Sequence, residues 1–369
     1  MTMWTPTYEI TPKTAKLLMA IEAAKADVEH LVISPAVETE LRRQARLRST
    51  HYSTRIEGNK LTLAEASMVV GNTKVSFRGR ERDVGEVRNY WNALVKVEDR
   101  AKAFKPVSEE LIKKLHALVE HGPRAKPTPY RDGQNVIRDA ASGAMVYLPP
   151  EAKDVPKLMA TFVRWLVKAD KLGVPVPLVA GLAHYQFVTV HPYYDGNGRT
   201  ARLLATFLLH RGGYGLNGFL SLEEYHAKDL ASYYRALAVH PHHNYYEGRA
   251  EADLTSWVDY FVATLAETFA VVRTEAKRLA RGKTQAVPDP LRKLDHRART
   301  VLGLFGEVER IGTGDVARVL GLSERMVRVL LTEWVRQGWL VVSDPSRKKR
   351  SYELSALYRR YVGNPTAPN

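Results

Sequence analysis

Apolar residues recur three and four positions apart along most of this chain, and that spacing predicts a mainly α-helical protein. An apolar-patterned and then charged helical region spans Lys13–Leu47, and two more helices are expected within residues 85–120, the second capped by Ser108. The same spacing predicts four helices that would complete a helical core: Val155–Lys168, Leu178–Val190, Asn197–Arg211 and Asp253–Arg278.

The pattern changes between Tyr130 and Pro150, where short apolar runs flank a turn-prone stretch. Val136 and Ile137 precede the stretch Asp139–Gly143, and the run Ala144–Leu148 follows it. Such an arrangement predicts a small β-hairpin with an open edge.

Residues 281–290 are rich in Gly, Pro and polar side chains, which predicts a linker. Beyond it, a short helix over Thr313–Leu320, a tight turn and a helix over Glu324–Gln337 capped by Ser323 are expected, followed by a strand at 339–342. This order resembles a winged-helix domain over residues 291–369, with Arg347–Arg350 as the basic tip of its wing. A winged helix binds either DNA or protein.

Composition limits the function classes. The 369 residues are 45% hydrophobic, enough for a full core, and the absence of cysteine excludes disulfides, thiolate metal sites and a cysteine nucleophile. No run of about 18 apolar residues is present, so we expect a cytoplasmic protein without a membrane partner. The formal charge of +15 favours anionic partners, and with Arg325, Arg328 and the basic tip it makes DNA a candidate partner.

One loop gathers the residues of nucleotide chemistry. Pro192 ends the helix before it, and Gly196 and Gly198 allow backbone angles that other residues avoid. A new helix is expected to begin at Asn197, so that its unpaired N–H groups and its dipole form an anion site of the kind that holds phosphates.

The side chains of the loop fit the same interpretation. Arg199 and Arg202 lie three residues apart, so we expect both to reach one polyphosphate. Asp195 beside the phosphates requires a divalent cation between them, and Mg²⁺ is the natural choice. His191 can accept a proton near neutral pH and suits the deprotonation of an attacking hydroxyl.

The run His191-Pro-Tyr-Tyr-Asp-Gly-Asn-Gly-Arg-Thr-Ala-Arg202 resembles the signature of the Fic domain, His-Pro-Phe-x-acid-Gly-Asn-Gly-Arg-x-x-Arg, with Tyr193 in place of the usual Phe. The resemblance implies a protein adenylyltransferase, which transfers AMP from ATP to a Ser, Thr or Tyr hydroxyl of a target protein and of itself. It also implies that His191 is the general base and that Asp195 holds Mg²⁺. The phosphates of ATP would be bound by Gly196, Asn197, Gly198, Arg199, Thr200, Ala201 and Arg202.

A second motif points to the same family. Ser53-Thr-Arg-Ile-Glu57-Gly58 resembles the [Ser/Thr]-x-x-x-Glu-[Gly/Asn] motif of the Fic inhibitory helix. Gly58 is expected just past a helix end, which places Glu57 in the last turn, where the dipole disfavours a carboxylate. The resemblance implies that Glu57 pairs with Arg202 and blocks the seat of the γ-phosphate. The chain would then divide into an N-terminal helical region with this motif (1–105), a Fic catalytic core (106–280), the linker and the winged helix.

In the family the hairpin is a flap that docks the target protein by strand addition. The usual Ile-Gly before it is Ile137-Arg138 here, and a hairpin that only packs remains the alternative. Tyr234 is our candidate for stacking on adenine, although its tyrosine cluster suits a core equally well. The histidines of His240–His243 lack a second ligand group at fixed spacing, so metal binding there is disfavoured.

Two other functions stay open at this point. The first is a Fic enzyme that removes AMP from a modified target, with Glu57 orienting a water. The second is a DNA-binding regulator whose Fic region only senses ATP, for which His191 would be dispensable. A homodimer is a further candidate assembly, and the target protein is not identified by the sequence.

Overall fold

The structure is a computed structural model that describes residues 3–31, 33, 35–72, 74–102, 106–138, 142–282, 289–292, 294–306, 308–320, 322–346, 350–359 and 362. The described residues fall into two compact units. Of the described residues, the first unit takes in those up to Lys25, 45–101 and 106–271, and the second takes in 26–44, Lys102 and those from Val272 onward. The fold is mainly helical with small antiparallel sheets, as the apolar spacing predicts.

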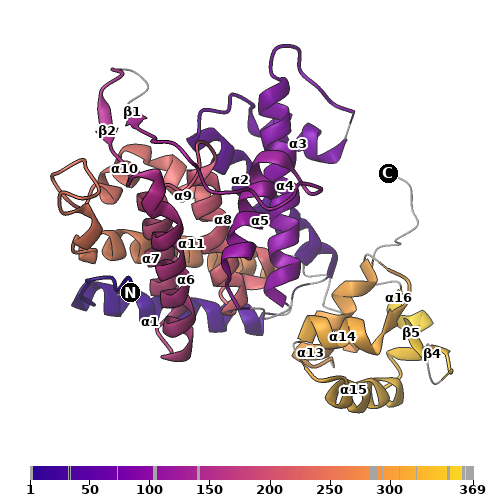
Figure 1. Cartoon of the computed structure of the whole chain (residues 1–369). Coiled ribbons are helices and arrows are strands. Elements are labelled where there is room, and N and C mark those ends of the chain that lie inside the picture. The colour runs from indigo at the N-terminus through magenta and orange to yellow at the C-terminus, as the bar shows by residue number, and fades with distance from the viewer. Residues whose placement is uncertain are drawn as a thin grey trace. The chain divides into compact units, whose positions relative to one another are not determined.

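Helices with local capping signals make up the N-terminal part of the chain (Figure 1). Thr62 and Glu65 form a capping box at the start of α3, and Ser108 accepts the Leu111 N–H at the start of α5, which confirms the predicted cap. The bounds are α1 Pro12–His30, α2 Pro35–Ile56, α3 Leu63–Gly71, α4 Glu81–Lys102 and α5 Glu109–His121.

The core of the first unit is built around α7, which is apolar on all sides and buried along nearly its whole length. It packs along α8, and Gly181 lets α11 approach, because a Cβ at this position would lie 2.8 Å from the Phe261 ring. The bounds are α6 Val155–Lys171, α7 Val176–Val190, α8 Asn197–Arg211, α9 Glu223–Lys228, α10 Leu230–Leu237 and α11 Thr255–Gly282. Short 3₁₀ turns lie at Ala152–Asp154, Leu216–Gly218 and Arg249–Glu251.

The predicted hairpin is present as β1 (Ile137–Arg138) and β2 (Met145–Tyr147), which pair antiparallel with Ile137 opposite Tyr147. We call residues 137–147 the flap. Its strands are shorter than the apolar runs suggested, and residues 139–141 of the predicted turn lie outside the described residues. Arg138 donates from Nη1 to the Gly143 carbonyl at 3.0 Å, so its side chain bonds across the hairpin.

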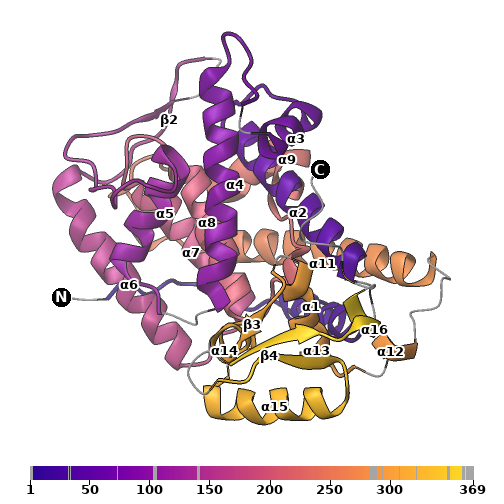
Figure 2. The same cartoon turned by 90° about the vertical axis from the view of Figure 1, so that its right-hand side faces the viewer.

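The second unit contains a three-stranded antiparallel sheet in the order β3-β5-β4 with helices beside it (Figure 2). The predicted helices and strand are present, and Ser323 caps α15 by accepting the Met326 N–H. Buried Trp334 and Trp339 lie in its apolar core. The bounds are α12 Asp289–Arg292, α13 His296–Leu302, a 3₁₀ turn Gly303–Gly306, β3 Ile311–Gly312, α14 Thr313–Leu320, α15 Glu324–Arg336, β4 Leu340–Asp344, β5 Ser351–Leu354 and α16 Ala356–Arg359.

The predicted linker and the predicted basic tip are described only in part. Helix α11 runs to Gly282 and α12 begins at Asp289, so both ends of the predicted linker 281–290 are helical, and residues 283–288 lie outside the described residues. Residues 347–349 of the predicted basic tip also lie outside them. The winged-helix interpretation stays a prediction. Among the residues that the structure describes, no helix has the length and apolar character needed to cross a membrane.

Candidate active site

His191 ends α7 in a left-handed conformation with φ of 51° and ψ of 59°, which is unusual for a residue other than glycine. Its N–H donates to the Phe187 carbonyl at 3.0 Å, and its Nδ1 lies 3.3 Å from the Val188 carbonyl. A carbonyl can only accept, so Nδ1 carries the proton and Nε2 keeps its lone pair. Burial lowers the pKa of His191 to about 4, and the ring is therefore neutral at pH 7 and able to accept a proton.

Arg131, which sequence reasoning missed, holds this backbone in place. Its Nε donates to the His191 carbonyl at 2.9 Å, and its backbone N–H donates to the Pro192 carbonyl at 2.9 Å. Its Nη2 donates to the Pro150 carbonyl just beyond the flap. One buried guanidinium thus joins the loop after α7 to the backbone just beyond the flap. No motif signals this role, since Arg131 lies 60 residues before His191.

The start of α8 at Asn197 agrees with the prediction, and Gly196 before it takes a left-handed conformation with φ of 73°. The Asn197 side chain closes the loop, because its Oδ1 accepts the Tyr193 N–H at 3.0 Å and its Nδ2 donates to the Tyr193 carbonyl at 2.8 Å. The first turn of a helix leaves N–H groups without intrahelical partners. The Thr200 N–H already donates to the Gly196 carbonyl at 2.9 Å, so the amides left for the predicted nest are those before Thr200, Gly198 among them. Phosphate binding by Gly198, Thr200 and Ala201 stays a prediction.

Arg202 is buried and bonded to the Ser53–Gly58 motif. Its Nη2 lies 2.7 Å from Glu57 Oε1 and 2.9 Å from the Ser53 carbonyl, and its Nε donates to Ser53 Oγ at 2.9 Å. A Cβ at Gly198 would lie 2.3 Å from Glu57 Oε1, so the Glu57 carboxylate rests on the first turn of α8. Only glycine leaves room for it there.

The placement of Glu57 differs in one detail from the sequence expectation. Helix α2 ends at Ile56, so Glu57 follows the helix instead of lying in its last turn, and its N–H donates to the Thr54 carbonyl at 3.0 Å. Gly58 then takes φ of 92°, as expected for a residue just past a helix end.

Arg199 has different surroundings from Arg202. Its side chain is 2% exposed and lies against three carboxylates: Glu120 Oε1 at 2.9 Å, Asp195 Oδ1 at 3.2 Å and Glu86 Oε1 at 3.5 Å. Burial raises the pKa of Glu120, although Arg199 opposes this rise. The shared contact of both arginines with one polyphosphate stays a prediction, because here the two face different acids.

Asp195 is the predicted ligand of a divalent cation. Its side chain is 59% exposed, and its Oδ1 accepts the Gly196 N–H at 2.6 Å. Burial opposes ionisation, but the Gly196 N–H, Arg199 and Arg82 outweigh it and lower the pKa of Asp195. Among the described residues no group of three or more acids and histidines could hold a metal, so a cation at Asp195 would need phosphate oxygens and water, which suits Mg²⁺.

Tyr233 lies in the core, whereas its neighbour Tyr234 lies at the surface. Tyr233 is buried, with its hydroxyl 2.9 Å from His184 Nε2. Tyr234 is 50% exposed, and its hydroxyl lies 3.5 Å from the carbonyl of Ile56, the residue before Glu57. The structure therefore brings Tyr234 to the edge of the predicted nucleotide site. Its stacking on adenine stays a prediction.

Tyr193, the departure from the Fic signature, is 2% exposed and stacks on His116 with ring centroids 3.6 Å apart. His116 Nε2 in turn lies 2.9 Å from the Asp195 carbonyl. The tyrosine thus fills the position of an aromatic anchor beneath the loop.

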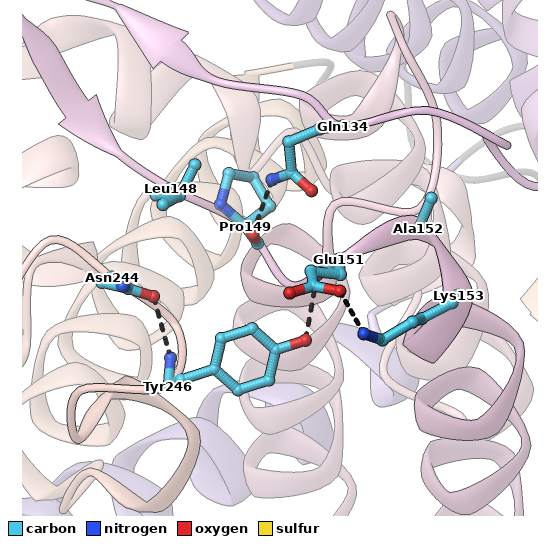
Figure 3. A pocket seen from close by; sticks show the side chains of 8 residues that line it. All are labelled: Gln134, Leu148, Pro149, Glu151, Ala152, Lys153, Asn244 and Tyr246. Carbon is cyan, nitrogen blue, oxygen red and sulfur yellow. Dashed lines mark hydrogen bonds and ion pairs between the residues drawn. The ribbon is translucent and has the colours of Figure 1, made fainter.

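A cavity of about 590 Å³ lies at the base of the flap (Figure 3). Its polar groups bond with one another: Gln134 donates to the Pro149 carbonyl at 3.0 Å, and the Tyr246 hydroxyl accepts the Glu151 N–H at 3.0 Å. His243, one of the histidines of 240–243, lies beside the same region, with its Nδ1 2.8 Å from the Val146 carbonyl of β2. The cavity is thus linked to His191 through Pro150 and Arg131, without containing it.

Comparison with known proteins covers the part of the chain that holds the flap and the loop from His191 to Arg202. The profile of the Fic/DOC family matches residues 106–209. A protein named protein adenylyltransferase Fic from Nematostella vectensis is 30% identical over 47% of this chain and 39% of its own length, and its namesake from Drosophila erecta is 29% identical over 47% and 34%. The chain therefore spans less than half the length of these relatives.

Solved structures extend the likeness. A Fic family protein from Desulfovibrio desulfuricans has a TM-score of 0.60 and 25% identity, with 96% of this chain and 99% of that chain covered. A Fic domain-containing signalling protein from Bacteroides thetaiotaomicron has a TM-score of 0.61 at 24% identity, over 72% of this chain and 97% of that one, and shows the fold alone.

Proposed function

Residues 106–209 are a domain of the Fic/DOC family, and from this premise we propose that the protein transfers AMP from ATP to a Ser, Thr or Tyr hydroxyl of a target protein. The observation that carries the proposal is the position of His191 in the loop that leads into α8, with Nδ1 3.3 Å from the Val188 carbonyl and Nε2 left to accept a proton. A base and a phosphate site in one loop are what transfer to a hydroxyl requires.

The proposed reaction uses His191 as general base. Nε2 takes the proton of the target hydroxyl as the hydroxyl oxygen forms a bond to the α-phosphorus of ATP. The bond from that phosphorus to the bridging oxygen breaks, and pyrophosphate leaves with the electron pair. Asp195 would hold Mg²⁺, which would supply positive charge for the phosphates, and the amides of the first turn of α8 would bind them.

Glu57 is proposed to inhibit the transfer. Its carboxylate lies 2.7 Å from Arg202 and against Gly198, in the place where an anionic phosphate would be bound. A carboxylate and a phosphate compete for the same guanidinium and the same amides, so ATP would be held in an unproductive position while Glu57 remains.

The target is proposed to dock at the flap. Met145 and Val146 of β2 are 47% and 41% exposed, and strand addition at a short hairpin presents the target backbone beside the loop. Arg131 supports this arrangement, because it bonds both the His191 carbonyl and the Pro150 carbonyl beyond the flap.

The test is incubation with ATP labelled on the α-phosphate in a cell lysate, followed by identification of labelled proteins, for the natural protein, Glu57→Gly and Glu57→Gly/His191→Ala. We expect labelling to rise in Glu57→Gly, including labelling of the protein itself. We expect it to fall by a factor on the order of a hundred or more when His191 is also replaced, while ATP binding remains.

Other outcomes separate the alternatives. Labelling that is unchanged without His191 contradicts the proposed base. Labelling that falls in Glu57→Gly, together with loss of AMP from a premodified target in the natural protein, favours the reverse reaction with Glu57 orienting water. ATP binding without any labelling in all three proteins favours a domain that only senses ATP.

A further inference from the structure

Arg82, near the start of α4, contacts the catalytic loop from outside both sequence motifs. Its Nη2 lies 3.0 Å from Asp195 Oδ2, and its Nε lies 3.0 Å from Glu86 Oε1. The side chain is 76% exposed, in contrast to the 2% of Arg199. Arg82 is therefore a solvent-exposed cation placed directly on the carboxylate that is the candidate Mg²⁺ ligand.

The two oxygens of Asp195 have different partners. Oδ1 accepts from the Gly196 N–H at 2.6 Å and from Arg199 Nη2 at 3.2 Å, so it is committed to the loop itself. Oδ2 bonds Arg82. A divalent cation that approaches Asp195 from solvent therefore meets the Arg82 guanidinium, and two cations cannot share that oxygen without repulsion.

We infer that Arg82 competes with the divalent cation for Asp195, so that cation binding requires Arg82 to leave Oδ2. The inference rests on the proposed nucleotide site, and it concerns a different contact from Glu57, which acts on Arg202. Release needs only a rotation of an exposed side chain. Glu86 can retain the guanidinium, and Glu86 itself is held by Asn59, whose Nδ2 donates to Oε2 at 3.0 Å.

The test measures cation binding rather than catalysis. Free Mn²⁺ is counted by electron paramagnetic resonance during titration of the protein in the presence of a saturating, non-hydrolysable ATP analogue, in the Glu57→Gly background. Arg82→Ala is expected to lower the Mn²⁺ concentration at half-saturation about threefold, the size expected when competition from one exposed ion pair is lost.

A matched control removes the same charge two residues away. Arg80 bonds Glu65, with Nη2 at 2.6 Å from Oε1, and touches no residue of the site in the described part of the chain. Arg80→Ala is expected to leave Mn²⁺ binding unchanged. In Asp195→Ala, further replacement of Arg82 is expected to have no effect, because the shared carboxylate is gone.

Equal shifts for Arg82→Ala and Arg80→Ala, or weaker Mn²⁺ binding in Arg82→Ala, would overturn the inference. AMP transfer is recorded separately on the same variants. Transfer without a selective Arg82 effect on Mn²⁺ leaves the proposed function standing and the competition wrong. A selective Arg82 effect on Mn²⁺ binding without any AMP transfer supports the competition and contradicts the proposed function.

Discussion

The backbone of His191 is held in a left-handed conformation by its neighbours. A left-handed conformation costs a residue with a side chain roughly 1–2 kcal/mol, and here bonds to the Phe187 carbonyl and from Arg131 hold it. The bond from His191 Nδ1 to the Val188 carbonyl fixes the tautomer of the ring. The strained backbone conformation and the fixed tautomer occur in the same residue, in which Nε2 is the atom that can accept a proton.

The pH dependence of transfer follows from the same residue. Since burial lowers the pKa of His191 to about 4, compared with 6.5 for an ordinary histidine, the active neutral form persists as the pH falls to about 5. We expect kcat/KM of Glu57→Gly to stay within a factor of about two between pH 7.5 and 5.5, and to fall as the pH passes through 4.

Folding must be followed in parallel, because the same shift affects stability. Between pH 6.5 and 4 the unfolded chain binds a proton at position 191 that the folded chain does not, so the free energy of unfolding decreases as the pH is lowered. Circular dichroism at each pH separates this loss from loss of catalysis. If kcat/KM instead falls between pH 7 and 6 while the protein stays folded, the result would contradict a base that is buried and neutral in this range.

At the scale of elements, the sequence predicted what local signals encode. Helix α8 runs over Asn197–Arg211, as its glycines and apolar spacing indicate, and the cap at Ser108 is confirmed. The acids around Arg199 were missed because Glu86 and Glu120 lie on α4 and α5, roughly 80 to 110 residues earlier, and nothing near either marks a partner so distant. Arg82 and Arg131 escaped notice for the same reason.

Helix α2 is fastened to the core at two positions one turn apart. Ser53 accepts two bonds from Arg202, and Ser49 Oγ donates to Glu223 Oε2 at 2.8 Å. Glu223 is 1% exposed and also accepts the Tyr90 hydroxyl at 3.0 Å. Since the helix is anchored through buried bonds, we expect any relief of the proposed inhibition to come from movement of the Glu57 side chain rather than from departure of α2.

The anchor can be tested by removing one hydroxyl. In Tyr90→Phe the buried Glu223 loses one of its two side-chain donors, and we expect the free energy of unfolding in urea to fall by about 1–3 kcal/mol. Tyr246→Phe removes a hydroxyl from a ring that is 51% exposed, and a change within about 0.5 kcal/mol is expected. Equal effects of the two replacements would contradict a buried anchor.

At the scale of the whole molecule, the charge of +15 remains to be explained, because the proposed nucleotide site is rich in acids. Arg199 is surrounded by three carboxylates and Arg202 is paired with Glu57. Part of the excess lies in the C-terminal part of the chain, where α15 exposes Arg325 and Arg328. Arg328 pairs with Glu324 at 2.8 Å, a surface contact that DNA phosphates could replace at small cost.

If this part of the chain is a winged helix that binds DNA, its affinity depends steeply on salt. With about five phosphates neutralised, the full-length protein is expected to bind duplex DNA with a slope of log affinity against log salt of roughly −4 to −5. Replacement of Arg347 and Arg350 by Glu should weaken binding to all sequences alike, since a phosphate clamp carries no base information. Fluorescence anisotropy over a salt series measures both quantities.

The control makes the same charge change elsewhere. Lys13 and Lys16 are exposed on α1, and their joint replacement by Glu lowers the net charge of the chain by the same amount. If the two double variants weaken DNA binding equally, the attraction comes from the overall charge and not from the tip. If the natural protein does not bind duplex even at low salt, protein docking or dimerisation is the role that remains to be tested. Met326 and Val329, 50% and 67% exposed on that helix, then favour a protein surface, because apolar side chains beside arginines are typical of protein contacts.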